Sequence, residues 1–360
     1  MSQENCNIES LIQFGRNNGK HWDAISNATE LTKTDKATIQ SVIQADGLDY
    51  LSEDNDLVVF GSIARGEVTS GSDVDWTLLV DGQVNSSRNF QMASLIQNGL
   101  KNKKLKDPGP NGPFGNITFS HDLVHYIGGQ DDTNHNLTQR SLLLLESAII
   151  SGNDNPRTGT AYDRVLMAII EQYIDNDSGY RVNNPNPHFA PRFLLNDVVR
   201  YWRTICVDFA YKQIEQEGNK WAIRNFKLRL SRRLIFLKGF LICFYCYLNK
   251  LTKEPAKQKL FELVKLNPLG LVFCILSDPK LNIKQEYILN LFDAYNQFLT
   301  KLNDSEFRKS LENLKIENAY ENSMFLKSRE ISSQFHSALS AILFEQDNDL
   351  KEFIHKYGIF

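Results

Sequence analysis

The residues best suited to chemistry lie between Phe60 and Trp76, in the run Phe-Gly-Ser-Ile-Ala-Arg-Gly-Glu-Val-Thr-Ser-Gly-Ser-Asp-Val-Asp-Trp. If its end forms a strand, Asp73 and Asp75 point to one face, because alternate side chains of a strand share a face. Neighbouring carboxylates repel each other unless a cation lies between them. Oxygen ligands of this kind suit Mg²⁺ or Mn²⁺, which bind one or two carboxylates together with substrate phosphates. The pattern therefore predicts a metal site at Asp73 and Asp75.

The same run contains groups that favour a phosphate. Gly61 and Ser62 follow a short apolar run, 57–60, that predicts a strand ending in a helical turn. Glycine lets a phosphate approach the backbone, while free N–H groups and the serine hydroxyl donate to it. Arg65 lies one turn further on, and Ser72 directly precedes the carboxylates. Either motif alone is usually a solvated turn, but together they predict a metal–polyphosphate site.

This combination resembles the signature of the DNA polymerase β-like nucleotidyltransferase superfamily. Its fuller form, with Ala-Arg-Gly-Glu after the Gly-Ser pair, is most similar to the PII uridylyltransferase-like branch. Fainter similarities to that branch lie at residues 119–124, 136–146 and 221–229. The last hundred residues resemble nothing in it, and its regulatory and hydrolase domains have no room in this chain.

The resemblance implies transfer of a nucleoside monophosphate from a triphosphate to an acceptor hydroxyl, with release of pyrophosphate. Asp73 and Asp75 would hold two Mg²⁺ ions that bridge the triphosphate. Gly61 and Ser62 would bind the β- and γ-phosphates, and Arg65 would help to neutralise them.

Members of the superfamily usually have a third carboxylate on a later strand, which binds the catalytic metal or acts as base. The resemblance makes Asp122 the candidate, because a strand or strand pair is predicted over 117–127. Asp131 or Asp132, in the loop that follows, could serve instead.

The elements that must position these residues form a mixed α/β (α+β) arrangement. A helical lead-in is predicted for residues 1–56. A small catalytic domain follows at 57–130, with strands at 57–60, 74–80 and 117–127 and a helix at 86–104. A helical substrate-binding domain follows at 131–360, and the active site is expected in the cleft between these two domains. Its periodic segments are 142–150, 165–174, 193–214, 221–248, 287–302 and 331–344.

Charge is unevenly distributed along the chain. The formal net charge is −3, but residues 191–260 hold 15 Lys and Arg against 5 Asp and Glu. This segment is therefore +10 and the remainder −13. Some of these cations are expected to face the carboxylates and contact the triphosphate or an acidic acceptor. Arg224 and Lys227, one turn apart, are the candidates; a solvated helix face is the alternative.

Other features exclude some classes of protein. Five cysteines without regular spacing do not make a disulfide framework, and their odd number fits a reducing cytoplasm. Cys243 and Cys246 lie in an apolar helix without a second pair, so core packing is favoured over zinc binding. The apolar run 234–248 is shorter than the roughly 20 residues that span a bilayer. A cytoplasmic protein without membrane segments is expected.

The acceptor is the least determined part. A protein hydroxyl is the first choice from the resemblance, and ATP or UTP is the expected donor. A small molecule such as an aminoglycoside, or an RNA 3′ end, are the rivals within the enzyme class. A catalytically degenerate nucleotide-binding partner in a toxin–antitoxin or defence system is the alternative outside it, and a missing third carboxylate would favour it.

Overall fold

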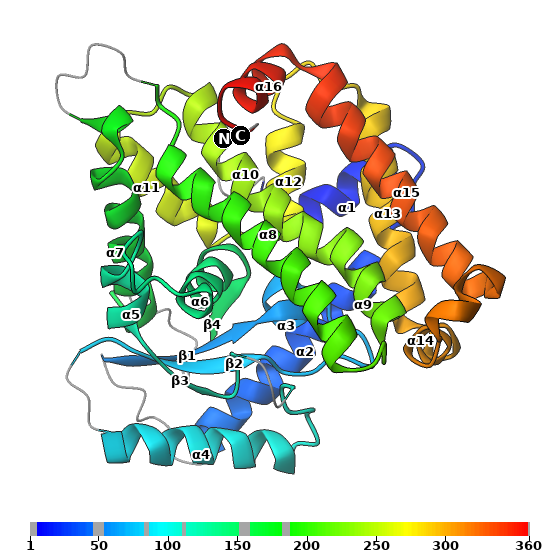
Figure 1. Cartoon of the computed structure of the whole chain (residues 1–360), viewed down its shortest axis with the longest axis horizontal. Coiled ribbons are helices and arrows are strands. Elements are labelled where there is room, and N and C mark those ends of the chain that lie inside the picture. Colours follow the sequence, from blue (N-terminus) through cyan, green and yellow to red (C-terminus); the bar gives the residue numbers. More distant parts are fainter. Residues whose placement is uncertain are drawn as a thin grey trace. The chain divides into compact units, whose positions relative to one another are not determined.

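The computed structural model describes residues 6–45, 54–82, 86–109, 113–150, 159–181 and 188–358 (Figure 1). The chain divides into two compact units that interleave along the sequence. Unit 1 comprises residues 1–27, 182–252 and 266–360, and unit 2 comprises 28–181 and 253–265. Unit 2 contains the whole of the predicted catalytic range.

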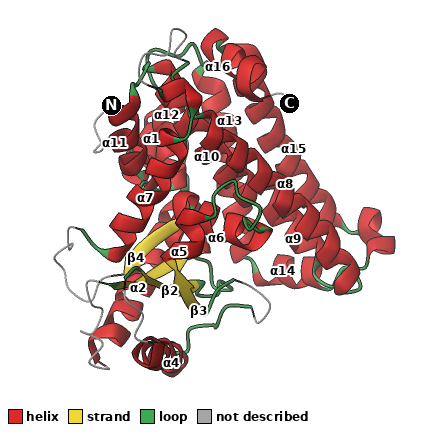
Figure 2. Ribbon diagram, turned by 60° about the vertical axis from the view of Figure 1, so that its left-hand side comes forward, coloured by secondary structure: helices red, strands yellow, loops and turns green. Residues whose placement is uncertain are grey.

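A single four-stranded sheet forms the centre of unit 2, with helices making most of the rest (Figure 2). The strands are β1 (Asn55–Phe60), β2 (Trp76–Val80), β3 (Asn116–Phe119) and β4 (Ser147–Ile150), in the order β3-β2-β1-β4. β1 is antiparallel to both of its neighbours, whereas β2 and β3 run parallel. The register pairs Val59 with Trp76 and Val80 with Phe119.

One face of the sheet carries the hydrophobic core of unit 2. Val74, Trp76, Leu78 and Val80 all point into it, as their alternation predicts. The C-terminal part of α2 (Asp23–Ala45) and α4 (Ser86–Asn102) cover this face (Figure 1). The opposite face is covered by α5 (Ser120–His125) and α6 (Asn134–Leu145).

Two further helices complete unit 2 although they lie far apart in the sequence. These are α7 (Ala161–Asp175), followed by the short η2 (Ser178–Tyr180), and α11 (Lys253–Val264). Lys253 and Lys257 of α11 both pair with Asp175, at 2.7 and 2.8 Å between Nζ and Oδ1. α7 therefore packs against α11, a helix that lies about a quarter of the chain further along the sequence.

Unit 1 is helical throughout its described residues. It contains α1 and the start of α2, then α8 and a continuous helical run of α9, η3 and α10, and then the C-terminal helices. Their bounds are α1 (Ile8–Asn17), α8 (Arg192–Glu215), α9 (Trp221–Lys227), η3 (Leu228–Arg232), α10 (Arg233–Leu248), α12 (Pro268–Leu276), α13 (Gln285–Asn303), α14 (Ser305–Glu312), η4 (Ile316–Glu321), α15 (Ser323–Ala341), η5 (Ile342–Gln346), α16 (Asn348–Phe353) and η6 (Ile354–Gly358). The small sheet and large helical region agree with the predicted fold class.

Unit 1 contains both free and disulfide-bonded cysteines. Cys243 and Cys246 are buried in α10 without a disulfide, as core packing predicts. Burial raises the pKa of the Cys246 thiol to about 12. Cys6 and Cys274, in contrast, form a disulfide across 268 positions of sequence. The sequence did not predict this bridge, because its partners share no spacing motif.

None of the helices in the described residues is long and apolar enough to cross a membrane.

Two predicted strands and one predicted helix need correction. The strand expected from Val74 begins at Trp76. The strand expected over 117–127 ends at Phe119, because its partner β2 ends at Val80 and no ladder remains beyond that pair. The helix expected over 142–150 ends at Leu145, and β4 follows it. β1 is buried, so the backbone groups on its second side need hydrogen-bonding partners, and β4 supplies them. This requirement outweighs the helix-like apolar spacing of the last residues in the range 142–150. The part of the helical lead-in at 46–53 lies outside the described residues.

Candidate functional site

The Gly-Ser pair lies where β1 ends and α3 (Gly61–Arg65) begins. Gly61 adopts φ +64°, in the left-handed region that favours glycine. The chain leaves the strand at this point, so the first N–H groups of α3 have no partner within the helix. The turn closes at Gly66, and the Glu67 N–H donates to the Ser62 carbonyl at 2.8 Å. Ser62 itself is half-buried.

Asp75 lies directly against this turn. The N–H of Phe60 donates to the Asp75 carbonyl at 2.8 Å, which extends the β1–β2 ladder by one bond. A Cβ atom at Gly61 would lie 2.7 Å from Oδ2 of Asp75. Any side chain at Gly61 would therefore displace the carboxylate. The absence of a side chain brings backbone and carboxylate together at one edge of the sheet.

Asp73 shares this side of the segment. The intervening Val74 is buried in the core, and its N–H donates to the Lys106 carbonyl at 2.9 Å. Asp73 is exposed and Asp75 half-buried, whereas Val74 between them is buried. Ser72 holds the preceding turn, because its hydroxyl accepts from the Thr69 N–H at 3.0 Å.

Arg65 takes a role that the sequence did not predict. Its guanidinium is buried rather than turned toward a phosphate. Nε donates to Glu67 at 2.8 Å, and Nη1 donates to Glu146, which caps α6 directly before β4. The two carboxylates are also buried, so the arginine neutralises them and ties α3 to β4. Arg65 is thus engaged by two carboxylates, and its expected help in neutralising a bound triphosphate remains a prediction.

Asp122 lies far along the sheet from the carboxylate pair. It is exposed in the first turn of α5, which follows the end of β3, and not on a strand. β2 and β3 run parallel, and Asp75 precedes the start of β2, so Asp122 lies at the opposite edge. Asp131 and Asp132 follow later still. Asp131 is exposed, and Asp132 pairs with buried Arg140 through two bonds of 3.0 and 2.9 Å.

The comparison with known families selects this region of the chain. Residues 44–108 match the family model described as a nucleotidyltransferase domain, and this range includes both motifs. The chain carries a nucleotidyltransferase domain. The match agrees with the predicted superfamily. No curated protein matches the chain.

Nucleotidyltransferases of this kind generally use a divalent metal, and the residues present fit one. Asp73 and Asp75 supply oxygen donors, the type that Mg²⁺ prefers. Within the described ranges, no group of three or more His, Cys, Asp or Glu is arranged to hold a metal ion. Asp73 and Asp75 would therefore hold it together with phosphate oxygens of the substrate, rather than within a closed protein cage.

β3 offers no acidic ligand to the candidate site. Its residues are Asn116, Ile117, Thr118 and Phe119. The Thr118 hydroxyl is engaged by that of Thr77, at 2.8 Å. None of the three candidates for the third carboxylate therefore lies on β3, and their proposed role remains a prediction.

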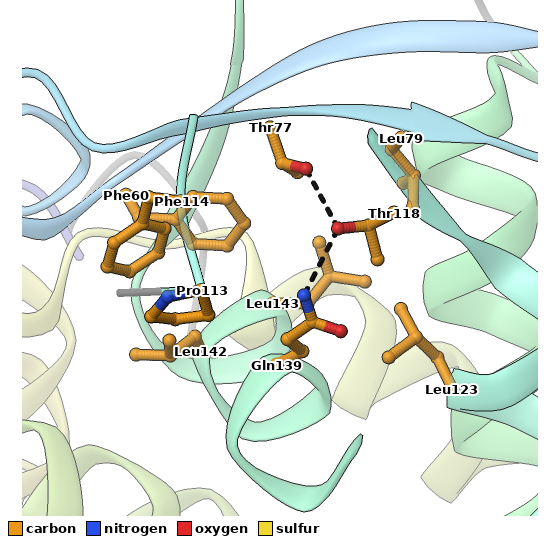
Figure 3. A pocket seen from close by; sticks show the side chains of 10 residues that line it. All are labelled: Phe60, Thr77, Leu79, Pro113, Phe114, Thr118, Leu123, Gln139, Leu142 and Leu143. Atoms are coloured by element: carbon orange, nitrogen blue, oxygen red, sulfur yellow. Dashed lines mark hydrogen bonds between the residues drawn. The ribbon is translucent and has the colours of Figure 1, made fainter. Parts of the chain in front are cut away.

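A small hollow lies on the carboxylate face of the nucleotidyltransferase sheet (Figure 3). Thr77 and Leu79 of β2 line it, and they follow Asp75 at alternate positions. The Phe60 and Phe114 rings pack together at one end, with 5.2 Å between their centroids. Its empty volume, including open solvent, is about 280 Å³. The polar side consists of Thr77, Thr118 and Gln139, and the Gln139 amide donates to Thr118 at 3.3 Å.

Arg224 and Lys227 belong to unit 1, whereas the nucleotidyltransferase motifs belong to unit 2. The Arg224 side chain donates to Gln216. Burial lowers the pKa of Arg224, and the nearby Asp208 and Glu215 oppose that shift. The contact of Arg224 and Lys227 with the triphosphate remains a prediction.

Sequence reasoning missed the structural role of Glu67 and Glu146. Both lay within segments that carried the family resemblance, Glu67 in the Ala-Arg-Gly-Glu run and Glu146 at the end of the leucine-rich helix. An acidic residue that ends an apolar run next to a strand is a usable signal for a buried ion pair. Its partner, 81 positions away, cannot be inferred from spacing.

Proposed function

We propose that the chain transfers a nucleoside monophosphate from a nucleoside triphosphate to an acceptor hydroxyl, with release of pyrophosphate. The observation that supports this most is the contact between Gly61 and Asp75. It brings a turn with free N–H groups and a carboxylate to one point, and a metal–triphosphate complex requires both.

The residues of the chain would divide the work as follows. The N–H groups at the start of α3 and the Ser62 hydroxyl would donate to phosphate oxygens. Asp73 and Asp75 would hold Mg²⁺ or Mn²⁺, which neutralises the triphosphate and polarises the phosphorus that is attacked. Ser72 would keep the turn before the carboxylates in place through its bond to Thr69. Arg65 would act only by holding α3.

The acceptor and the donor base are the finer part of the proposal. Resemblance to the PII uridylyltransferase-like branch favours a protein hydroxyl as acceptor, with ATP or UTP as donor and the cytoplasm as location. A small molecule and an RNA 3′ end remain the competing acceptors. The hollow beside Phe60 and Phe114 would contact an apolar part of whichever substrate lies over the carboxylates.

One observation favours a second candidate function. β3 carries no carboxylate, whereas the superfamily's third acidic group usually lies on such a later strand. A chain that retains Gly61, Ser62 and the two carboxylates could bind nucleotide without transferring it. Such a protein would act as a nucleotide-binding partner in a toxin–antitoxin or defence system.

The deciding experiment incubates the purified chain with each α-³²P-labelled nucleoside triphosphate, Mg²⁺ or Mn²⁺, and a cell lysate. Products are separated into protein, RNA and small-molecule fractions. The doubly substituted Asp73→Asn, Asp75→Asn protein should lose the label. Asp122→Asn is the matched control, and it should keep the label because Asp122 lies at the other edge of the sheet.

Each result has a distinct meaning. Label in one fraction that disappears only in the double variant would establish both enzyme and acceptor class. Nucleotide binding without label in any fraction would favour the degenerate binding partner. Loss of label in Asp122→Asn would contradict the placement of the site at the Gly61 edge.

A further inference from the structure

Unit 1 contains a cluster of arginines contributed by four helical segments. We define the arginine cluster as Arg203 of α8, Arg229 of η3, Arg233 at the start of α10 and Arg329 of α15. Arg203 is exposed and the other three are half-buried, so all four are accessible to solvent. α8 packs against α10, and α15 packs against η3. Arg229 lies near enough to Arg233 and Arg329 to act on them electrostatically, and Arg203 and Arg233 both act on Cys206.

The charge of the arginine cluster is not compensated by any carboxylate that the structure describes. Within the described part of the chain, none of the four arginines forms an ion pair with an acidic side chain. The nearest acidic residues on the same helices are engaged elsewhere. Asp208 of α8 pairs with Lys212 at 2.8 Å, and Glu330 of α15 pairs with Lys327 at 2.9 Å.

Two of the four guanidinium groups, those of Arg229 and Arg233, are held in place by neutral contacts. Arg233 lies over the Trp202 ring, with Cζ 6.0 Å from its centroid, and its Nη1 is 3.2 Å from Nδ1 of His336. Nε of Arg229 donates to Asn225 at 2.9 Å, and the terminal nitrogens have no partner among the residues described. Contacts of this kind orient an arginine without using its charge.

The charges also act on one another. Burial lowers the pKa of Arg233, and the neighbouring Arg229 lowers it further. Burial lowers the pKa of Arg229 as well, and Arg329 adds to that shift. Like charges held together in this way raise the free energy of the empty protein, and a bound anion relieves the repulsion.

We propose that the arginine cluster is a binding site for phosphate groups. Planar guanidinium groups bind phosphate through paired hydrogen bonds, and clusters of them are characteristic of such sites. The site lies wholly in unit 1 and does not depend on the proposed nucleotidyl transfer. The phosphate could belong to a free nucleoside triphosphate or to an RNA strand.

The surface beside the cluster offers a second contact for an RNA strand. Val207, Tyr211 and Ile214 follow Arg203 on one face of α8, at helical spacing, and their side chains are 68, 58 and 79% exposed. An aromatic ring next to phosphate-binding arginines provides a stacking surface for a base.

The first arm of the test measures binding of a labelled single-stranded RNA oligonucleotide to the full chain by fluorescence anisotropy. Arg229→Gln with Arg233→Gln is compared with Lys212→Gln with Lys327→Gln, which removes the same charge from neighbouring surface positions. The arginine variant should bind at least about tenfold more weakly. Its slope of log K against log salt should be smaller by about 1.4, for two phosphate contacts of roughly 0.7 each.

The second arm measures binding of ATP without divalent metal to the Asp73→Asn, Asp75→Asn protein, so that unit 2 contributes little. Loss of ATP binding on adding the two arginine changes would identify a triphosphate as the ligand. Loss of RNA binding alone would identify a polynucleotide.

A charge-preserving variant separates the site from general attraction and from misfolding. Arg229→Lys with Arg233→Lys keeps the charge but loses the paired geometry, so it should bind between the wild type and the glutamine variant. Thermal unfolding confirms that each variant is folded. The proposal is overturned if the wild type binds neither ligand. It is also overturned if Lys212→Gln with Lys327→Gln weakens binding as much as Arg229→Gln with Arg233→Gln.

Discussion

Arg65 allows a direct test of how unit 2 holds the Gly61 turn. Its side chain is 7% exposed, and its partners Glu67 and Glu146 are 2 and 0% exposed. Replacing Arg65 with methionine keeps the volume but leaves two buried carboxylates without this cation. Breaking a buried ion pair from one side generally costs about 3–5 kcal/mol. For a domain of this size, that corresponds to a fall in Tm of roughly 6–20 °C.

The same contacts rank the partner substitutions. Glu67→Gln leaves the Arg65–Glu146 pair intact, and we expect a loss of about 1–3 kcal/mol. Glu146→Gln removes the tie between α3 and β4, so its effect should lie between the other two. The order of destabilisation is therefore Arg65→Met, then Glu146→Gln, then Glu67→Gln.

The assay is thermal and urea unfolding of the full chain near neutral pH, with circular dichroism as the signal that reports unfolding. Arg164→Met is the matched control, because Arg164 pairs with Asp81 at 2.8 Å but its side chain is 41% exposed. That change should cost no more than about 1 kcal/mol. Equal losses for Arg65→Met and Arg164→Met would refute the reasoning, and so would a larger loss for Glu67→Gln than for Arg65→Met.

Three shorter predictions concern other parts of the chain. Gly61→Ala should abolish nucleotide transfer in the labelling assay while lowering stability by only about 1–3 kcal/mol, because it forces an unfavourable φ and pushes Asp75 aside. Burial raises the pKa of Tyr162 to about 12, so the unfolded chain loses this proton first as pH rises above 10. Stability should therefore fall by up to about 2.7 kcal/mol between pH 10 and 12, a loss that Tyr162→Phe removes in urea titrations; an equal loss in both proteins would contradict this. Reduction of the Cys6–Cys274 bridge should lower stability by roughly 2–5 kcal/mol, and peptide mapping without reductant should recover the linked pair.

The local parts of the site follow from the sequence. The strand–turn–helix at Gly61 and the shared face of Asp73 and Asp75 depend on neighbouring residues, and the alternation of Val74 and Trp76 records which side is buried. The long helices of unit 1 were equally predictable, because their apolar spacing extends over many turns.

The remaining parts depend on contacts that sequence spacing does not record. Arg65 looked like a phosphate ligand because its buried partner Glu146 is 81 positions away. Asp122 was placed on a strand because nothing in its own segment shows that β2 ends at Val80. The arginine cluster joins residues that are more than a hundred positions apart, so only the charge excess of one part of it was visible.

The docking of α11 onto α7 makes the order of folding differ from the order of synthesis. Lys265 pairs with Asp163 at 2.5 Å, and both residues belong to unit 2, although a segment of unit 1 is made between them. A fragment ending at residue 181 would include the whole sheet and the entire family match, yet it would leave the α11-binding surface of α7 uncovered. On the ribosome, unit 2 can therefore be completed only after residue 265 has emerged, and an expression boundary at residue 181 would leave this surface of α7 exposed.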